Sequence, residues 1–220
     1  FIDSDDIVAT DYIGSMLAHV GKGIRIASCG YCYYYDSGKK IKINYENIRQ
    51  YYKGIEAQKY LNIIGYFNVS SCNKLLETSL FNEIRFPVGK KSEDWYVMYK
   101  LIEKAGGIYY NSDIKYFYRQ RNGSITKSTM VNDEAIDAAL EVYNYYLVQE
   151  WNEAIPYAAQ SLAFANVGVY NAYLCGKVNK KAMRNIRENV LSIKETMTLD
   201  ELSRTRKIQM ILFMKNRIIY

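Results

Sequence analysis

The chain has 220 residues, 49% of them apolar, and a formal net charge of +6. With 23 tyrosines and only two prolines, it is not a disordered or Pro-rich linker protein, and it can hold one large or two small domains. No apolar run reaches the roughly 18 residues that a membrane-spanning helix needs.

The excess positive charge lies at the C-terminal end. Residues 179–220 hold 10 Lys and Arg against 4 Asp and Glu, whereas residues 1–178 hold 19 of each kind. A basic segment on a neutral body favours an anionic partner, either a membrane surface or nucleic acid. Aromatic residues are spread along the whole chain and no nucleic-acid motif occurs, so we expect no nucleic-acid partner.

The first stretch, Phe1-Ile2-Asp3-Ser4-Asp5-Asp6, runs from two apolar residues into three carboxylates. We interpret it as a buried strand ending at a sheet edge, with Asp3 and Asp5 on the same side of an extended backbone. Such a pair suits Mg²⁺ or Mn²⁺, which take oxygen ligands and keep positions for phosphates. Turn and helix-cap roles remain open for the same residues. Because Phe1-Ile2 reads as the middle of a strand, we expect a fragment of a longer protein.

The next elements are a helix over 12–20, strands over 24–44 with a hairpin turn at Asp36-Ser37-Gly38, and a helix over 54–63. Cys29 and Cys32 have the C-x-x-C spacing of redox and metal sites. They lie in a strand-like run, where positions three apart face opposite sides, so we expect free thiols.

A helix is predicted to begin at Ser92-Glu93-Asp94-Trp95, with an apolar face continuing through Met98, Leu101, Ile102 and Ala105. Glu93 and Asp94 occupy its first turn, where the helix dipole favours the charged form of a carboxyl group. They either complement that dipole or include a general base kept ionised at neutral pH. The spacing alone does not decide between these interpretations.

Strands predicted over 107–110 and 114–119 lead to Arg119-Gln120-Arg121-Asn122-Gly123-Ser124. The two arginines and the Gly-Ser turn can bind phosphate through guanidinium and backbone N–H donors, or they form a solvated loop.

From about residue 131 the pattern is helical, with further helices over 152–175, 179–196 and 199–214. Ile136, Leu140, Tyr143 and Leu147 share one apolar stripe at helical spacing. Thr198-x-x-Glu201 predicts a capping box for the last helix. Residues 204–217 form an apolar run bracketed by cations, which suits a helix in a membrane interface or one packed on its own domain.

Five of these pieces, taken in order over residues 1–126, resemble the family 2 glycosyltransferases of the GT-A fold, in particular bacterial enzymes of capsule, lipopolysaccharide or exopolysaccharide assembly. The acidic start resembles the family's D-x-D strand, and Cys29-Gly30-Tyr31 is similar to its next strand. The other matches are Asn73-Lys74-Leu75 with Ile84-Arg85-Phe86-Pro87, Glu93-Asp94, and Tyr118-Arg119-Gln120-Arg121 with Gly123-Ser124-Ile125. Cys72 stands where the family commonly has tryptophan, a departure on the acceptor side.

The resemblance implies an α/β fold, with residues 1–128 as the C-terminal half of a GT-A (Rossmann-like) catalytic domain and residues 129–220 as a helical domain with a basic amphipathic end. Its roles would be Asp94 as catalytic base with Glu93 in support, and Asp5 and Asp3 as ligands of Mn²⁺ or Mg²⁺. Asp3 would support the metal or contact the nucleotide ribose, Arg119 and Arg121 would close over the diphosphate, and Ser124 would be a further contact to the nucleotide.

The implied reaction is inverting transfer of a sugar, of the hexosyltransferase type, from a nucleotide-sugar, foremost a UDP-sugar, to a hydroxyl of a saccharide or lipid-linked acceptor in cell-surface polysaccharide biosynthesis. The family's nucleotide-binding N-terminal half is absent, so we expect this fragment alone to be inactive. We expect a cytoplasmic location, with peripheral contact at the inner face of the membrane through residues 204–217. The alternative is a non-catalytic membrane-surface or carbohydrate-binding module that keeps part of the fold.

Overall fold

The computed structural model describes residues 1–43, 45–121, 131–176 and 178–215. The chain divides into two compact units: Phe1–Val88 with Glu93–Lys127, and Gly89–Ser92 with Ser128–Tyr220. The first unit combines a sheet with helices, and the described part of the second is helical. The expected class, an α/β region followed by helices, is confirmed.

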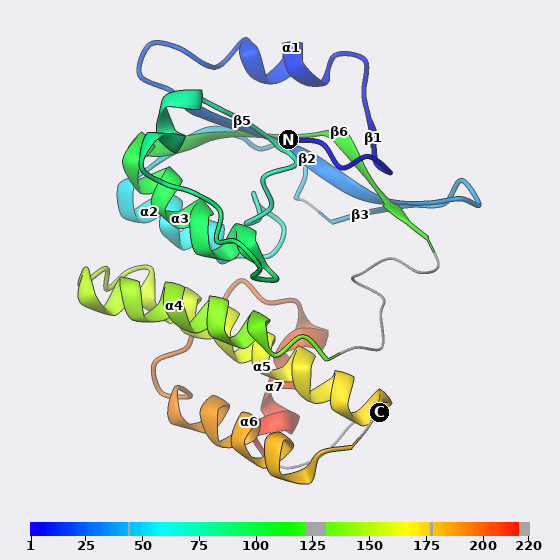
Figure 1. Ribbon diagram of the computed structural model, residues 1–220, viewed down its shortest axis with the longest axis vertical. Helices are drawn as coiled ribbons and strands as arrows, with labels where there is room; N and C mark the ends of the chain where they lie inside the picture. Colours follow the sequence, from blue (N-terminus) through cyan, green and yellow to red (C-terminus); the bar gives the residue numbers. More distant parts are fainter. Residues whose placement is uncertain (44, 122–130, 177, 216–220) are drawn as a thin grey trace. The chain divides into compact units, whose positions relative to one another are not determined.

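The first unit is built on a six-stranded mixed sheet (Figure 1). Its two long strands, β2 (Ile26–Tyr35) and β6 (Gly107–Gln120), lie side by side and run parallel. Four shorter strands pair antiparallel with these two: β1 (Ile7–Val8) and β4 (Arg49–Lys53) with β6, and β3 (Lys40–Lys42) and β5 (Lys74–Leu76) with β2. The C-terminal ends of β2 and β6 therefore lie at the same edge of the sheet.

Helices cover both faces of this sheet (Figure 1). Helix α1 (Tyr12–Leu17) lies on one face, and α2 (Gly54–Leu61) and α3 (Glu93–Ala105) lie on the other. A short 3₁₀ helix, η1 (Thr78–Asn82), follows β5. Helix α3 buries Met98, Leu101, Ile102 and Ala105, as its apolar spacing predicts.

Strand β6 is continuous, whereas the sequence predicts two strands there. Its register against β2 passes from Cys29–Asn111 to Gly30–Ile114, so Ser112 and Asp113 are extra residues in a bulge. A Cβ on Gly30 would lie 2.2 Å from the carbonyl oxygen of Ser112, so this position requires glycine. The polar residues 111–113, which separate the two predicted strands, thus lie inside one continuous strand.

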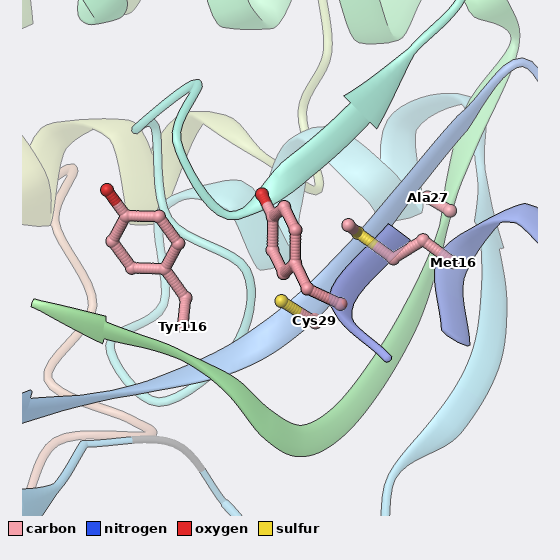
Figure 2. Packing of buried hydrophobic residues seen from close by; sticks show 5 residues of the cluster. Met16, Ala27, Cys29 and Tyr116 are labelled. Carbon is pink, nitrogen blue, oxygen red and sulfur yellow. The ribbon is translucent and has the colours of Figure 1, made fainter. Parts of the chain in front are cut away.

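A small apolar cluster joins α1 to the sheet, as Figure 2 shows for Met16, Ala27, Cys29 and Tyr116 together with Tyr12. Burial raises the pKa of the Cys29 thiol to about 12. Cys32, also buried, is a free thiol like Cys29, which confirms the expectation for both. The cluster fixes Tyr116, which contributes to the site described below.

The predicted buried strand at the start of the chain is wrong. Phe1 is 60% exposed and Ile2 51% exposed. A turn at Ser4 and Asp5 follows, closed by a 3.1 Å hydrogen bond from the Asp6 N–H to the Asp3 carbonyl, and β1 begins only at Ile7. Asp3 and Asp5 therefore do not alternate along an extended backbone. Asp and Ser side chains favour such turns, and in this segment the turn forms instead of the extended strand that was predicted.

The second unit contains α4 (Glu134–Val148), α5 (Ile155–Cys175), α6 (Lys180–Ser192) and α7 (Arg204–Met214). The apolar stripe of α4 that the sequence shows is not the buried side of the helix, since Leu140 is 40% exposed and Leu147 43% exposed. The buried residues of α4 are instead Ala138, Ala139, Val142 and Tyr146. Small alanines on α4 and α5 let the two helices approach closely, so they outweigh the larger side chains of the stripe.

Helix α7 packs within its unit through one side. Met210 is fully buried, and the Phe213 ring meets Tyr170 edge to face at 5.0 Å. Arg187 donates hydrogen bonds to the carbonyls of Phe213 and Met214 at 3.0 and 2.7 Å, which satisfies the end of the helix.

The start of α7 differs from the predicted capping box. Ser203 is the N-cap, accepting from the Arg206 N–H at 3.4 Å, whereas Thr198 accepts from Asp200 in an earlier turn. Within the described ranges, every helix is too short or too polar to traverse a bilayer.

Candidate functional site

A cavity of about 270 Å³ in the α/β unit gathers acidic, amide and tyrosine side chains from segments far apart in the sequence. It lies among the turn before β1, the strands β2 and β6, the loop before β5 and the start of α3. Its lining residues are Asp3, Asp6, Tyr31, Tyr33, Asn68, Ser70, Cys72, Asn73, Asp94, Tyr116 and Tyr118. It has the mixed aromatic and polar lining typical of a small-molecule site.

Two of the predicted site residues, Asp3 and Asp94, line this cavity together. Helix α3 carries Asp94 in its first turn, and the turn at Ser4-Asp5 places Asp3 beside Tyr116, whose hydroxyl accepts from the Asp3 N–H at 3.4 Å. Glu93 and Asp5 are not among the lining residues. Each of the two acidic motifs thus contributes one residue to the cavity, Asp3 from the first and Asp94 from the second.

Asp94 is a half-buried carboxyl group held by its neighbours. It accepts hydrogen bonds from the hydroxyl and the backbone N–H of Ser71. Desolvation raises the pKa of Asp94, while the bonds from Ser71 and the positive charge of Lys74 act to lower it. A carboxylate with a raised pKa is a better proton acceptor once ionised, which suits a general base.

Asp6 is a lining residue that the sequence reasoning did not select. Its carboxylate accepts a short hydrogen bond from the Tyr116 hydroxyl and a 2.8 Å bond from the Arg119 N–H. Burial raises the pKa of Asp6, in opposition to those two bonds. Asp6 therefore ties the N-terminal turn to β6. Its place as the third acid of the run, directly before β1, is the signal that was available.

The predicted phosphate-binding arginines are both engaged in ion pairs. Arg119 contacts Asp36 at 2.7 Å, and Arg121 contacts Asp5 at 2.8 Å. The Arg121–Asp5 ion pair thereby joins the end of β6 to residues 3–6, which we call the acidic turn. A cation and a carboxylate therefore lie side by side next to the cavity. Ser124, the last predicted member of this group, lies outside the described residues.

The carboxylates of the acidic turn offer the hard oxygen donors that Mg²⁺ and Mn²⁺ prefer. Among the residues that the structure describes, no three His, Cys, Asp or Glu side chains gather to hold a metal ion. Asp6 accepts hydrogen bonds from Tyr116 and the Arg119 N–H, and Asp5 pairs with Arg121, so Asp5 could join Asp3 as a metal ligand only if that ion pair opens. One or two carboxylates fit an ion that completes its shell with water and substrate phosphates.

No known protein-family profile matches the chain. Two curated proteins of Streptococcus pneumoniae serotype 4 (strain ATCC BAA-334 / TIGR4) are similar to it: glycosyltransferase GlyA, 28% identical over 142 residues, and glycosyltransferase GlyG, 28% identical over 135 residues. Each alignment covers 58% of this chain, but 19% of GlyA and 45% of GlyG. The chain thus spans less than half the length of either relative. Both relatives are named for sugar transfer.

Proposed function

We propose that the α/β unit is part of an inverting, metal-dependent family 2 glycosyltransferase of the GT-A fold. The reaction would move a sugar from a nucleotide-sugar, foremost a UDP-sugar, to a hydroxyl of a saccharide or lipid-linked acceptor in cell-surface polysaccharide biosynthesis. The observation that carries the proposal is the meeting of Asp3 and Asp94 on one tyrosine-lined cavity. The similarity to two proteins named glycosyltransferase supports it independently.

In this proposal Asp94 takes the proton from the acceptor hydroxyl as that oxygen attacks the anomeric carbon. Inversion requires such a base on the face opposite the leaving diphosphate. Ser71 holds the Asp94 carboxylate in place, and Glu93 adds negative charge beside it. Desolvation keeps Asp94 basic, so that proton removal has a larger driving force than with an exposed carboxylate.

In this proposal the acidic turn and the end of β6 bind the diphosphate of the donor and its metal ion. Asp5 and Asp3 would hold Mn²⁺ or Mg²⁺, which supplies charge neutralisation to the departing diphosphate. Arg119 and Arg121 would release Asp36 and Asp5 to contact phosphate oxygens. Asp5 would therefore pair with Arg121 in the free protein and bind the metal ion in the substrate-bound protein. Ser124 is kept as a further proposed contact to the nucleotide.

The test is donor turnover by the longest form of the protein that contains this chain, with a panel of UDP-sugars and Mn²⁺. Asp94→Asn should lower kcat about 10²-fold or more and leave donor affinity nearly unchanged, because the base acts in the transition state. Asp113→Asn is the matched control, since Asp113 pairs with Arg49 and does not line the cavity. Equal activity of Asp94→Asn and the control would contradict the base assignment.

The competing function is a non-catalytic carbohydrate-binding module. It predicts binding of free saccharides with no turnover of any nucleotide-sugar. Isothermal titration of that same longer form with UDP and Mn²⁺, beside titration with simple saccharides, separates the two. Saccharide binding without nucleotide binding or turnover in the longer form would favour the module.

A further inference from the structure

Lys74 is a buried lysine whose side chain the proposed reaction does not use. It is 2% exposed, and lysine is rarely so buried without partners. Its Nζ lies 2.6 Å from the Ser70 carbonyl, 2.7 Å from the Asn68 carbonyl and 2.8 Å from Asn73 Oδ1, with Asn68 Oδ1 at 3.3 Å. An ammonium group has three N–H donors for these oxygens, whereas a neutral amine has two. The protonated form is therefore the one that satisfies all three short contacts.

All of these acceptors belong to one loop, residues 68–73, and Asn68, Ser70 and Asn73 line the cavity. The same loop supplies Ser71, which hydrogen-bonds Asp94. Asn73 also anchors the loop to β2, since its side-chain amide donates to the Cys29 carbonyl at 2.9 Å and its own carbonyl accepts from the Cys29 N–H at 3.0 Å. The Lys74 ammonium group thus binds three oxygens of the loop whose Ser71 hydrogen-bonds the candidate base, Asp94.

We propose that Lys74 is a positioning residue, whose buried ammonium closes the 68–73 loop and so sets both the place of Ser71 and the charge of Asp94. The catalytic meaning of this role rests on the proposed function, in which Asp94 is the base. The coupling between Lys74 and Asp94 does not depend on it.

The surroundings of Lys74 act on its charge in opposite directions. Burial lowers the pKa of Lys74 to about 7, and the negative charge of Asp94 acts to raise it. For Asp94, Lys74 and Ser71 favour the ionised form, while burial and Glu93 oppose it. Loss of the Lys74 charge therefore removes a stabilising partner from the Asp94 carboxylate.

The test follows the Asp94 carboxyl carbon by NMR titration of the 220-residue chain labelled at aspartate, with Asp94→Asn to assign the signal. In Lys74→Met the proton affinity of Asp94 should rise about tenfold, as expected for loss of a nearby opposite charge. Lys74→Arg, which keeps the charge, should restore a titration close to that of the unchanged chain. Lys42→Met is the control, because Lys42 is 62% exposed and pairs with Glu46.

A reciprocal measurement remains available where Lys74→Met does not fold. Titration of the lysine side chains in Asp94→Asn should show the proton affinity of Lys74 falling about tenfold, since two coupled groups change each other equally. An unchanged Lys74 titration in Asp94→Asn overturns the proposal, as does an unchanged Asp94 titration in a folded Lys74→Met. Because neither readout requires turnover, a correct coupling with an inactive enzyme would reject the proposed function alone.

Discussion

Asp6 shows how one carboxylate can serve a site without taking part in its chemistry. It accepts hydrogen bonds from Tyr116 and from the Arg119 N–H, and both of those residues sit next to the cavity. The acidic turn is held at the end of β6 by these bonds and by the Asp5–Arg121 ion pair. The three acids of the run therefore have different surroundings, although they are adjacent in the sequence.

At this scale we expect Asp6→Ala to destabilise the α/β unit by about 1–3 kcal/mol, since it leaves a partly buried hydroxyl and an N–H without their acceptor. Urea unfolding, followed by tyrosine fluorescence, measures the loss. Asp11→Ala is the comparison: Asp11 pairs with Lys115 at the surface, where an ion pair contributes little. A loss no greater in Asp6→Ala than in Asp11→Ala would show that the tie to β6 is not structural.

Among the elements, the parallel pair β2 and β6 supplies the four tyrosines that line the cavity. Five lining tyrosine and cysteine positions lie on these strands or directly before β5: Tyr31, Tyr33, Tyr116, Tyr118 and Cys72. The bulge at Ser112-Asp113 sets which residues of β6 stand opposite β2 beyond Gly30. A change in that bulge would shift Tyr116 and Tyr118 relative to Tyr31 and Tyr33.

Gly30→Ala should therefore cost about 1–3 kcal/mol or more, because the new methyl group overlaps the Ser112 carbonyl and the strands must separate. Thermal and urea unfolding both report this loss. Gly14→Ala serves as the control, since Gly14 lies in α1 with nothing within 4 Å of an added Cβ, and alanine favours a helix. Equal stability of Gly30→Ala and the unchanged chain would contradict the crowding at the bulge.

Helix α7 makes up most of residues 204–217, the segment predicted to contact the membrane. Its exposed side presents Arg204, Ile208, Ile211 and Lys215, spaced four, three and four residues apart, with Ile208 46% exposed and Ile211 37% exposed. The opposite side holds Met210 and Phe213 inside the unit, and Arg206 stacks on the Phe164 ring at 5.2 Å. Only the exposed side is therefore available for a leaflet, and Arg217 lies outside the described residues.

We expect the chain to sediment with vesicles that contain anionic lipid, and Ile208→Glu with Ile211→Glu to weaken this binding at least tenfold. Each basic residue near an anionic leaflet contributes about 1 kcal/mol, which salt should weaken. Leu140→Glu is the control, a similarly exposed apolar position on α4. Binding that is insensitive to anionic lipid, or equally strong in the double variant, would exclude an α7 anchor.

For the whole molecule, Lys74 links stability to pH. Its pKa is lowered to about 7 in the folded chain, against an ordinary value of 10.5. A group with a lowered pKa contributes stability that is present above its unfolded pKa and is lost as pH falls through its folded pKa. Between pH 10.5 and 7 the unfolded chain binds more protons at this position, so acidification within that window favours unfolding.

The free energy of unfolding of the unchanged chain should therefore rise relative to that of Lys74→Arg as pH is raised from 7 to 9.5. Arginine stays charged over this range, while the tyrosines and the other lysines titrate alike in both proteins. Urea unfolding at closely spaced pH values measures the difference. A difference that does not change with pH would mean that Lys74 keeps an ordinary pKa in the folded chain.

The sequence by itself indicated the α/β class through its resemblance to a known family, and it determined the face of α3 and the hairpin at residues 36–38 through local periodicity and turn residues. It also selected Asp3 and Asp94, through motifs whose residues come together in space. Periodicity could not select the core face of α4, where close packing of alanines on α5 prevails over side-chain size. Nor could it identify Lys74 and Asp6, because both owe their surroundings to partners brought near only by folding: the 68–73 loop around one, and Tyr116 and Arg119 around the other.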